Sequence, residues 1–406
     1  MNCHIKIIIK LFAILYWMFL LVSCERPNDK MAEFSKINDR IKNEYAPDKR
    51  VAIYDISLIP IQDHILLKGE SDQAKAVEEL KQELTDSGIQ FTDSIDLLPN
   101  KSVGEFKYAV INNSVANIRS KPKHSAELAT QALLGTGLKV LKIAGSFYLV
   151  QVPDGYISWV DHGGVTLMNE RDYANWIEAD KVIYTKTVGN VYQEENDHTA
   201  ILSDIVLGAQ LKLINKGIDF FTVEFPDKRI GYIKNNEARL YNEWIQNVQP
   251  SGDLIEKYAR DFLGSPYLWG GTSIKGMDCS GFTKTVYLMN GFIIPRDASQ
   301  QIHAGKNIDK NLKFEGLEKG DLMFFGKTAT DSTNQRVTHV GIWLGNDKGE
   351  FIHSASQVRL SSIDVESEYY DENNTKRYLG SRRYLGFKDP KITNLKTDKI
   401  RTDIKQ

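Results

Sequence analysis

Cysteine is scarce in this sequence. The 406 residues contain three cysteines, at positions 3, 24 and 279, with no CxxC pair and no cysteine and histidine cluster at metal-ligand spacing. Structural zinc sites and disulfide frameworks need such sets. The sequence therefore argues against both, it implies no metal or organic cofactor, and each cysteine has to be interpreted separately.

An excess of charge of either sign is also missing. The sequence has 51 basic and 53 acidic side chains, a formal charge of −2, and no block of lysine and arginine interleaved with aromatic residues. Binding to a phosphate backbone depends on such a positive surface. We therefore expect no nucleic-acid partner. The length predicts two to four soluble domains.

The apolar run nearest the amino terminus is shorter than a membrane span. It extends from Leu11 to Val22 and follows Lys6 and Lys10, as in the core of a signal peptide. The run ends in Leu-Val-Ser-Cys, which resembles the lipobox of bacterial lipoproteins and implies acylation of Cys24. We expect residues 1–23 to be the signal and the rest to be exported and lipid-anchored to a bacterial membrane, facing the periplasm. A plain membrane anchor or an ordinary secretory signal is the alternative.

The next part of the chain, residues 24–105, is expected to be a small α/β segment without chemistry of its own. A helix is predicted near 33–45, and Ala76, Leu80 and Leu84 recur at helical spacing. At the other end, residues 389–406 are rich in Lys, Thr and Asp and are predicted to be disordered.

An internal repeat dominates the middle of the sequence. Residues 128–160 match residues 73 positions later without gaps, for example Leu134-Gly135 with Leu207-Gly208. Short alternating runs separated by Gly and Pro-Asp turns predict two small β-barrels, at 106–170 and 171–248. They resemble paired bacterial SH3-like domains of cell-wall proteins.

The two copies of the repeat differ at a pair of polar positions. Glu127 and Tyr156 of the first copy align with Ala200 and Arg229 of the second. A carboxylate and a phenol can hold an ammonium group by charge-assisted hydrogen bonds. We expect the first barrel to bind one, and the alternative is that both barrels are spacers.

The remaining cysteine lies where a nucleophile would. Asp278-Cys279-Ser280-Gly281 opens a helical run after a glycine-rich approach, so Cys279 is predicted at a helix amino terminus, where the dipole favours the thiolate. We expect an accessible nucleophile; the alternative is a buried structural cysteine.

Two histidines can supply the base. Residues 338–343 and 350–354 read as two strands of a hairpin. Centring its turn on Asp347 pairs His339 with Ala355 and puts His353 diagonally beside His339 on the same face, whereas a slip of one residue would separate them. His339 would take the thiol proton, and His353 would hold the His339 ring in the productive orientation. The alternative is that each histidine is structural or simply exposed, as a lone histidine on a strand usually is.

At this point the sequence resembles the NlpC/p60 cell-wall cysteine peptidases over about residues 250–388. The motifs that carry the resemblance are Pro266–Gly271, Asp278–Phe282, Arg296-Asp297, Gly320–Leu322, Thr338–Gly341 and His353-Ser354. It implies a multidomain α+β protein in which two small SH3-like β-barrels precede a papain-like α+β cysteine peptidase domain, at 249–388.

The resemblance also implies further site residues. Tyr267 would form the oxyanion site with the backbone N–H of Cys279. Asp278, Ser280 and Asp297 would recognise substrate, and the alternative is that each merely caps a helix or turn. Ala298 stands where the family often has serine.

The expected function is hydrolysis of the γ-D-glutamyl-L-diamino acid bond in cell-wall peptides with a free amino-terminal L-alanine. Two barrels before the catalytic domain resemble the subgroup with this selectivity. The selectivity has a physical rationale, since a barrel that closes one end of the cleft would exclude glycan-linked stems. The alternatives are an endopeptidase on intact peptidoglycan, with the barrels as wall anchors, and a non-catalytic wall-binding protein. We expect a monomer.

Overall fold

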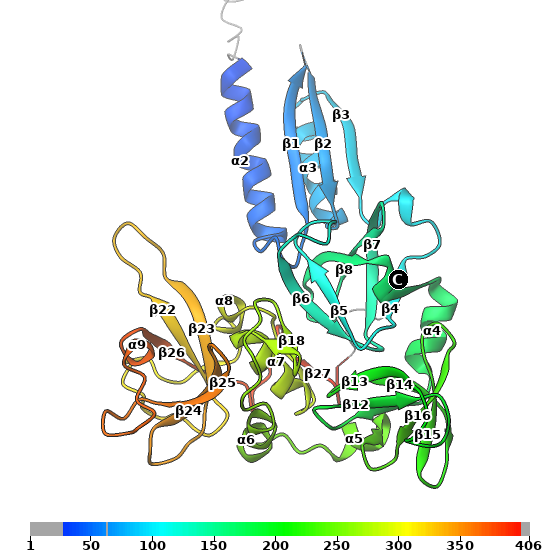
Figure 1. The fold of residues 1–406 in the computed structure, drawn as a ribbon. Coiled ribbons are helices and arrows are strands. Elements are labelled where there is room, and N and C mark those ends of the chain that lie inside the picture. Colours follow the sequence, from blue (N-terminus) through cyan, green and yellow to red (C-terminus); the bar gives the residue numbers. More distant parts are fainter. Residues whose placement is uncertain (1–26, 62–63, 399–406) are drawn as a thin grey trace, which may run out of the picture. The chain divides into compact units, whose positions relative to one another are not determined.

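The computed structural model describes residues 27–61 and 64–398 (Figure 1). The expected signal at 1–23 and Cys24 lie outside the described residues. The chain divides into two units, one up to Leu98 and one from Pro99 onward. Among the described helices, none combines the length and the apolar character needed to cross a membrane.

The first unit is a three-stranded sheet with two helices, in agreement with the expected α/β character. Strands β1 and β2 are antiparallel, and β2 and β3 are parallel. Ala76, Leu80 and Leu84 are buried as their helical spacing predicts. The elements are α2 (Pro27–Tyr45), β1 (Tyr54–Ile61), β2 (His64–Ser71), α3 (Ala74–Asp86) and β3 (Phe91–Leu97).

Two seven-stranded barrels open the second unit, and they share one strand order. The first, after η1 (Lys101–Val103), consists of β4 (Tyr108–Ile111), β5 (Val115–Arg119), β6 (Leu128–Leu133), β7 (Gly137–Ala144), β8 (Phe147–Gln151), β9 (Ile157–Asp161), η2 (His162–Gly164) and β10 (Val165–Met168). The second consists of β11 (Lys181–Tyr184), β12 (Val188–Tyr192), β13 (Ile201–Val206), β14 (Gln210–Lys216), β15 (Phe220–Glu224), β16 (Ile230–Lys234) and β17 (Ala238–Leu240).

The structural repeat is longer than the repeat visible in the sequence. Strands β4, β5, β6, β8 and β9 each begin and end 73 residues before their counterparts in the second barrel. The first two of these strands lie outside the self-similar stretch of 128–160. Their counterparts keep the spacing, and equivalent core positions such as Ile118 and Val191 are both fully buried. Helix α4 (Glu170–Glu178) joins the barrels, and α5 (Tyr241–Asn247) follows the second.

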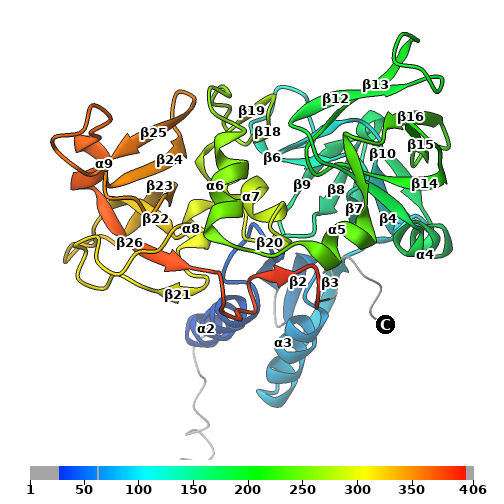
Figure 2. The same cartoon turned by 90° about the horizontal axis from the view of Figure 1, so that it is seen from below.

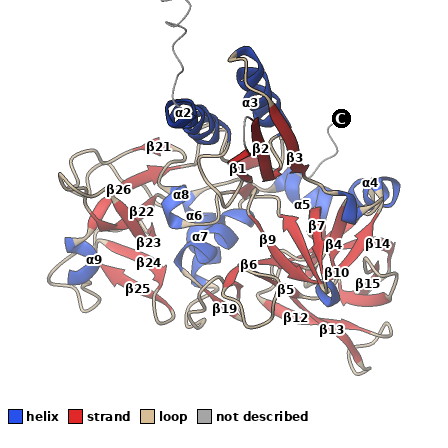
Figure 3. Ribbon diagram, turned by 90° about the horizontal axis from the view of Figure 1, so that it is seen from above, coloured by secondary structure: helices blue, strands red, loops and turns tan. Residues whose placement is uncertain are grey.

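The carboxy-terminal domain is a six-stranded sheet with helices beside it (Figures 2 and 3). Helix α7 contacts β23 and β24 and packs Phe282 and Val286 into the same core as Val340 and Ile352. The elements are α6 (Gly252–Arg260), β18 (Thr272–Ser273), β19 (Gly276–Met277), α7 (Cys279–Leu288), β20 (Phe292–Ile293), α8 (Ala298–Gln301), β21 (Lys306–Asn307), β22 (Leu322–Lys327), β23 (Arg336–Trp343), β24 (Glu350–Ser354), β25 (Val358–Ser362), α9 (Glu372–Lys376), β26 (Tyr378–Arg383) and β27 (Thr393–Asn394).

The expectation that residues 389–406 are disordered is wrong for their first part. Strand β27 pairs antiparallel with β20, and the N–H of Leu395 donates to the carbonyl of Gly291. Ile392 is buried in the core of the domain. The polar composition hid this short segment, because one buried isoleucine and two strand residues suffice to hold it. Residues 399–406 lie outside the described part.

Candidate active site

Cys279 is the first residue of helix α7. Asp278 is its amino-terminal cap, and the Asp278 carboxylate accepts the N–H of Gly281 at 2.7 Å. Cys279 is 7% exposed, so it is buried rather than accessible as the glycine-rich approach indicated. The backbone N–H groups of Val340 and Ser280 stabilise its anionic form, which places the sulfur against β23 beside the residue that follows His339.

The helix terminus does not make Cys279 a thiolate, which corrects the expectation from the sequence. Burial and, to a smaller extent, the Asp278 charge together raise the pKa of the Cys279 thiol to about 12. The capping carboxylate already occupies the positive end of the helix, so the dipole that would favour the sulfur anion is largely compensated. Cys279 is therefore a neutral thiol at pH 7 and needs a base.

The base is a pair of histidines brought together by the β23–β24 hairpin. Nε2 of His339 lies 2.6 Å from Nδ1 of His353. The register pairs Ile342 with Ile352 and Trp343 with Phe351. Each of these pairs is centred on position 347, so the predicted register is confirmed and the two histidines are diagonal neighbours. His339 is left with Nδ1 as the ring nitrogen that can face the thiol.

Gly341 makes room for this diagonal contact. The register, continued by one residue, sets Gly341 opposite His353. A Cβ at position 341 would lie 3.2 Å from the Cβ of His353 and 3.1 Å from the ring of Phe351. The missing side chain therefore lets the His353 ring reach across to His339.

Both imidazoles are neutral in the free site. Burial lowers the pKa of His339 to about 4, and the charges of Arg377 and Arg359 lower it while Asp371 and Asp278 raise it. Burial and the neighbouring His339 lower the pKa of His353 to about 3. A neutral His339 can accept a proton, which is the state a general base requires.

The histidine pair continues into two residues that the sequence analysis missed. Nε2 of His353 lies 3.0 Å from Oγ of Ser361 on β25, and this hydroxyl donates to Oδ2 of Asp371 at 3.4 Å. Asp371 also caps α9, accepting the N–H of Asn374. The register between β24 and β25 could have identified Ser361. Arg359 pairs with His353, and Ser361, two residues later on the strand, lies on the same sheet face as the histidines. Asp371 returns through a loop and had no such signal.

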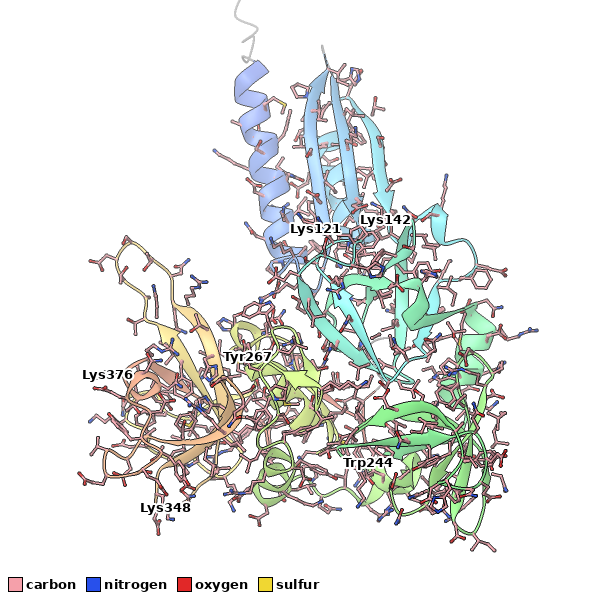
Figure 4. The ribbon with its side chains drawn as sticks, viewed as in Figure 1. Lys121, Lys142, Trp244, Tyr267, Lys348 and Lys376 are labelled. Carbon is pink, nitrogen blue, oxygen red and sulfur yellow. The ribbon has the colours of Figure 1, made fainter. Side chains whose placement is uncertain are left out.

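A cleft of about 440 Å³ adjoins His339. Tyr267, labelled in Figure 4, belongs to the loop between α6 and β18 and lines this cleft together with His339. Its side chain is 36% exposed. Burial raises the pKa of Tyr267 to about 12, and the charge of Cys279 adds to the shift. The hydroxyl is thus protonated at neutral pH and can donate a hydrogen bond beside the sulfur.

Asp278 and Ser280 are held in a buried network around Arg296. The guanidinium, 1% exposed, donates to both Asp278 carboxylate oxygens at 2.7 and 3.1 Å and to Oγ of Ser280 at 3.0 Å. Its Nε donates to Oγ1 of Thr130 in the first barrel at 2.8 Å. These contacts give Asp278 the capping role that was the alternative to substrate recognition, and direct contact with substrate stays a prediction for both residues. Asp297 forms a capping box at α8.

The first barrel lies against the loop that carries Tyr267. A Cβ on Gly270 would be 2.4 Å from the carbonyl oxygen of Leu128, so only glycine permits this approach. Glu127, the exposed residue just before β6, is therefore placed beside that loop. Tyr156 is half-buried against the barrel core. Neither residue lines the 440 Å³ cleft, and their role stays a prediction.

The comparisons with known proteins agree with this geometry. The NlpC/P60 family model matches residues 264–383, and a model of the bacterial dipeptidyl-peptidase SH3 domain matches residues 118–164. A Gamma-D-glutamyl-L-lysine dipeptidyl-peptidase of Bacillus cereus is 32% identical over 275 residues, covering 64% of this chain and 76% of the relative. The chain belongs to the NlpC/P60 family. It is a cysteine-type peptidase.

Other relatives support the same architecture. The Bacillus subtilis protein with the same printed name is 30% identical and is covered over 72% of its length, for 56% of this chain. A crystal structure of an NlpC/P60 family protein from Bacillus cereus superposes with a TM-score of 0.58 at 27% identity, covering 68% of this chain and 99% of that one. The expected fold class, SH3-like barrels followed by a papain-like α+β domain, is confirmed.

Proposed function

We propose that this NlpC/P60 peptidase hydrolyses the γ-D-glutamyl-L-diamino acid amide bond of cell-wall peptides, preferring short peptides with a free amino-terminal L-alanine. The observation that carries the proposal is the His339–His353 contact beside the amino terminus of the helix that holds Cys279. The bond is the one printed in the names of the Bacillus relatives.

The first half of the reaction forms a thioester. The Cys279 sulfur attacks the γ-carbonyl carbon while its proton passes to Nδ1 of His339. The oxyanion receives hydrogen bonds from the Cys279 N–H and the Tyr267 hydroxyl. The C–N bond then breaks, and the His339 imidazolium gives its proton to the leaving amine. His353 holds His339 in the orientation that both transfers need.

The second half releases the product. His339 takes a proton from water as the water oxygen attacks the thioester carbon. The C–S bond breaks, the carboxylic acid leaves, and the sulfur recovers the proton from His339. Apart from the substrate and this water, every group in the cycle belongs to the chain. The described residues contain no cluster of three or more His, Cys, Asp or Glu side chains placed to hold a metal.

The preference for a free amine rests on the first barrel. Glu127 directly precedes the strand β6 that packs beside the Tyr267 loop, and it supplies a carboxylate for an ammonium group, with Tyr156 as its proposed partner. Substrate recognition by Asp278, Ser280 and Asp297 is part of the proposal and is indirect for Asp278, which orients the helix that carries Cys279.

The proposal extends to the location of the protein. The lipobox-like ending at Cys24 supports an exported, lipid-anchored protein at a bacterial membrane, facing the periplasm, and the monomeric state is a separate part of the proposal. Growth with a labelled fatty acid would test it: label on the full-length protein that is lost in Cys24→Ala supports the anchor, and label on neither contradicts it.

Mass spectrometry of products tests the activity. Free L-Ala-γ-D-Glu-L-Lys, its diaminopimelate analogue, the tetrapeptides and whole sacculi are offered side by side. Release of L-Ala-γ-D-Glu from the short peptides alone supports the proposal, whereas release from sacculi at an equal rate favours an endopeptidase of intact peptidoglycan. Acetylating the alanine amine should strongly reduce cleavage. Failure of Cys279 to react with an active-site thiol reagent, with no product from any substrate, would leave a wall-binding protein.

A further inference from the structure

Two arginines line the cleft that contains Tyr267 and His339. Arg359 lies on β25 and Arg377 follows α9. Residues from two strands, one helix and the positions next to them complete the wall: Thr338, Ser354, Ala355, Asp371, Asn373 and Asn374. The reaction proposed for this site uses neither arginine.

Several N–H donors of these two guanidinium groups have no hydrogen-bond acceptor among the described residues. Nη2 of Arg377 donates to Oδ1 of Asn374 at 2.8 Å. Arg359 is half exposed, and its nearest acid, Asp371, is 3.9 Å away. Among the described residues, no hydrogen bond reaches the Arg359 guanidinium or Nη1 of Arg377. Donors left free at a cleft wall are available to an anionic ligand.

The single acid in the cleft is engaged elsewhere. The carboxylate of Asp371 accepts the N–H and Nδ2 of Asn374 at 3.0 and 2.8 Å and the hydroxyl of Ser361. Two guanidinium groups therefore face one occupied carboxylate, and the wall carries a net positive charge. This charge disfavours the His339 imidazolium in the free enzyme, and a bound anion would offset it.

The position of the arginines indicates which part of the substrate they meet. The first barrel adjoins the Tyr267 loop through Gly270, so in the proposed reaction the acyl part with its free amine would extend toward the barrel. With the leaving amine at His339 to receive its proton, the rest of the leaving group would meet the part of the same cleft wall that carries Arg359 and Arg377. In an L-diamino acid, the carboxylate is attached to the carbon that bears this amine, so it stays close to the imidazole.

We propose that Arg359 and Arg377 form a subsite for the carboxylate of the leaving diamino acid. The inference rests on the proposed function and adds that the subsite for the leaving group recognises this carboxylate. It makes the enzyme select peptides that end at the diamino acid, because amidation or extension there removes the charge that the arginines bind.

Kinetics on matched peptides test the subsite. The tripeptide acid and its carboxy-terminal amide are compared on the wild type, Arg359→Gln, Arg377→Gln and the double variant, with Arg171→Gln on the exposed face of α4 as the charge control. We expect the wild type to prefer the acid by about 10- to 100-fold in kcat/KM. The double variant should lose this preference because its kcat/KM falls on the acid and stays unchanged on the amide. Arg171→Gln should keep the preference.

Three other outcomes overturn the inference. A double variant that still prefers the acid shows that the arginines do not bind the carboxylate of the leaving group. Equal losses on acid and amide assign them a general role in the cleft. If the preference for the acid disappears when the D-glutamate carries an α-carboxamide, the arginines bind the α-carboxylate of the D-glutamate on the acyl side. A wild type that cleaves neither peptide refutes the proposed function itself.

A second inference comes from the hydrogen bonds behind the histidines. For Nδ1 of His339 to accept the thiol proton, its Nε2 must carry the ring proton and donate it to Nδ1 of His353. His353 must then carry its own proton on Nε2 and donate to Oγ of Ser361, 3.0 Å away. The Ser361 hydroxyl is consequently free to donate only onward, to Asp371. A carboxylate cannot donate in return, so it fixes the direction of the whole chain.

We infer that Ser361, oriented by Asp371, is a positioning residue that sets the productive tautomer of both histidines. In Ser361→Ala, His353 can move its proton to Nδ1 and donate to His339, which would leave the wrong His339 nitrogen protonated toward Cys279. The residue acts through the imidazoles and touches no substrate.

Tautomer and rate together test this role. We expect Ser361→Ala to lower kcat about 10- to 100-fold with KM nearly unchanged, Ser361→Thr to restore it, and ¹⁵N NMR to show the His339 ring proton moving from Nε2 to Nδ1. Asp371→Asn, which keeps a side-chain acceptor for the α9 cap, should cause the same tautomer change. Wild-type tautomers in both folded variants, or no rescue by threonine, would overturn the inference.

Discussion

His339 and His353 meet edge to face, with Nε2 of the first 2.6 Å from Nδ1 of the second and their ring planes at 77°. His353 is fully buried, whereas His339 retains partial exposure at the cleft. The buried ring therefore serves to orient the exposed one. The arrangement assigns proton transfer to His339 and positioning to His353.

Replacing Cys279 with alanine tests the nucleophile. We expect hydrolysis of the tripeptide to fall to background because no other described side chain at the site can form the thioester. The small apolar substitution fits a buried position, so thermal unfolding should change little. Turnover by the alanine variant at more than a few per cent of the wild-type rate would contradict the assignment.

The pH dependence of kcat/KM should report the depressed histidine pKa. His339 must be neutral to accept the thiol proton, and its pKa is lowered to about 4 by burial and by Arg377 and Arg359, against the opposite effect of Asp371 and Asp278. Activity is therefore expected to persist as the pH falls below 6.5 and to be lost only near pH 4. An acid limb centred near 6.5 would contradict this, provided that circular dichroism shows the protein folded.

The same shift predicts how stability depends on pH. The pKa of His339 is lower in the folded protein than its ordinary value of 6.5, and the pKa of His353, at about 3, is lower still. Between these values the unfolded chain binds more protons than the folded one, so acidification from 6.5 toward 4 reduces the free energy of unfolding. Urea denaturation of wild type and His353→Gln checks it: the variant should lose part of the dependence, and an identical slope would contradict the cause.

Gly341→Ala tests whether space opposite His353 is required. The added Cβ would lie 3.1–3.2 Å from Phe351 and His353, closer than ordinary contact, so one of the rings must move. We expect kcat/KM to fall about 10-fold or more and stability to fall by about 1–3 kcal/mol. Gly164→Ala in the first barrel, with its nearest contact at 3.4 Å, is the control that should retain activity. Normal activity in Gly341→Ala would show that the pair tolerates displacement.

The sequence predicted those parts of the site that depend on strand register and helix pattern within a short stretch of chain. Hairpin symmetry about Asp347 placed His339 beside His353, and the helical pattern after Asp278 placed Cys279 at a helix start. It failed on the ionisation of Cys279 because burial and the capping charge depend on tertiary packing. Ser361 and the strand β27 were missed because short polar stretches gain their contacts only from distant partners.

Breaking the pair between Asp278 and Arg296 should separate folding from recognition. Arg296 is 1% exposed, and Asp278→Asn would leave its guanidinium with the carboxylate of Asp297, 3.8 Å away, in place of the 2.7 Å ion pair with Asp278. Removing one partner of a buried ion pair costs about 3–5 kcal/mol. We therefore expect a large loss of stability in urea denaturation, while Thr130→Val, which removes the Nε contact and a 3.4 Å hydrogen bond to the carbonyl of Gln131, should cost less. If Asp278→Asn keeps its stability and loses only substrate affinity, Asp278 contacts substrate directly and the structural role assigned to it is wrong.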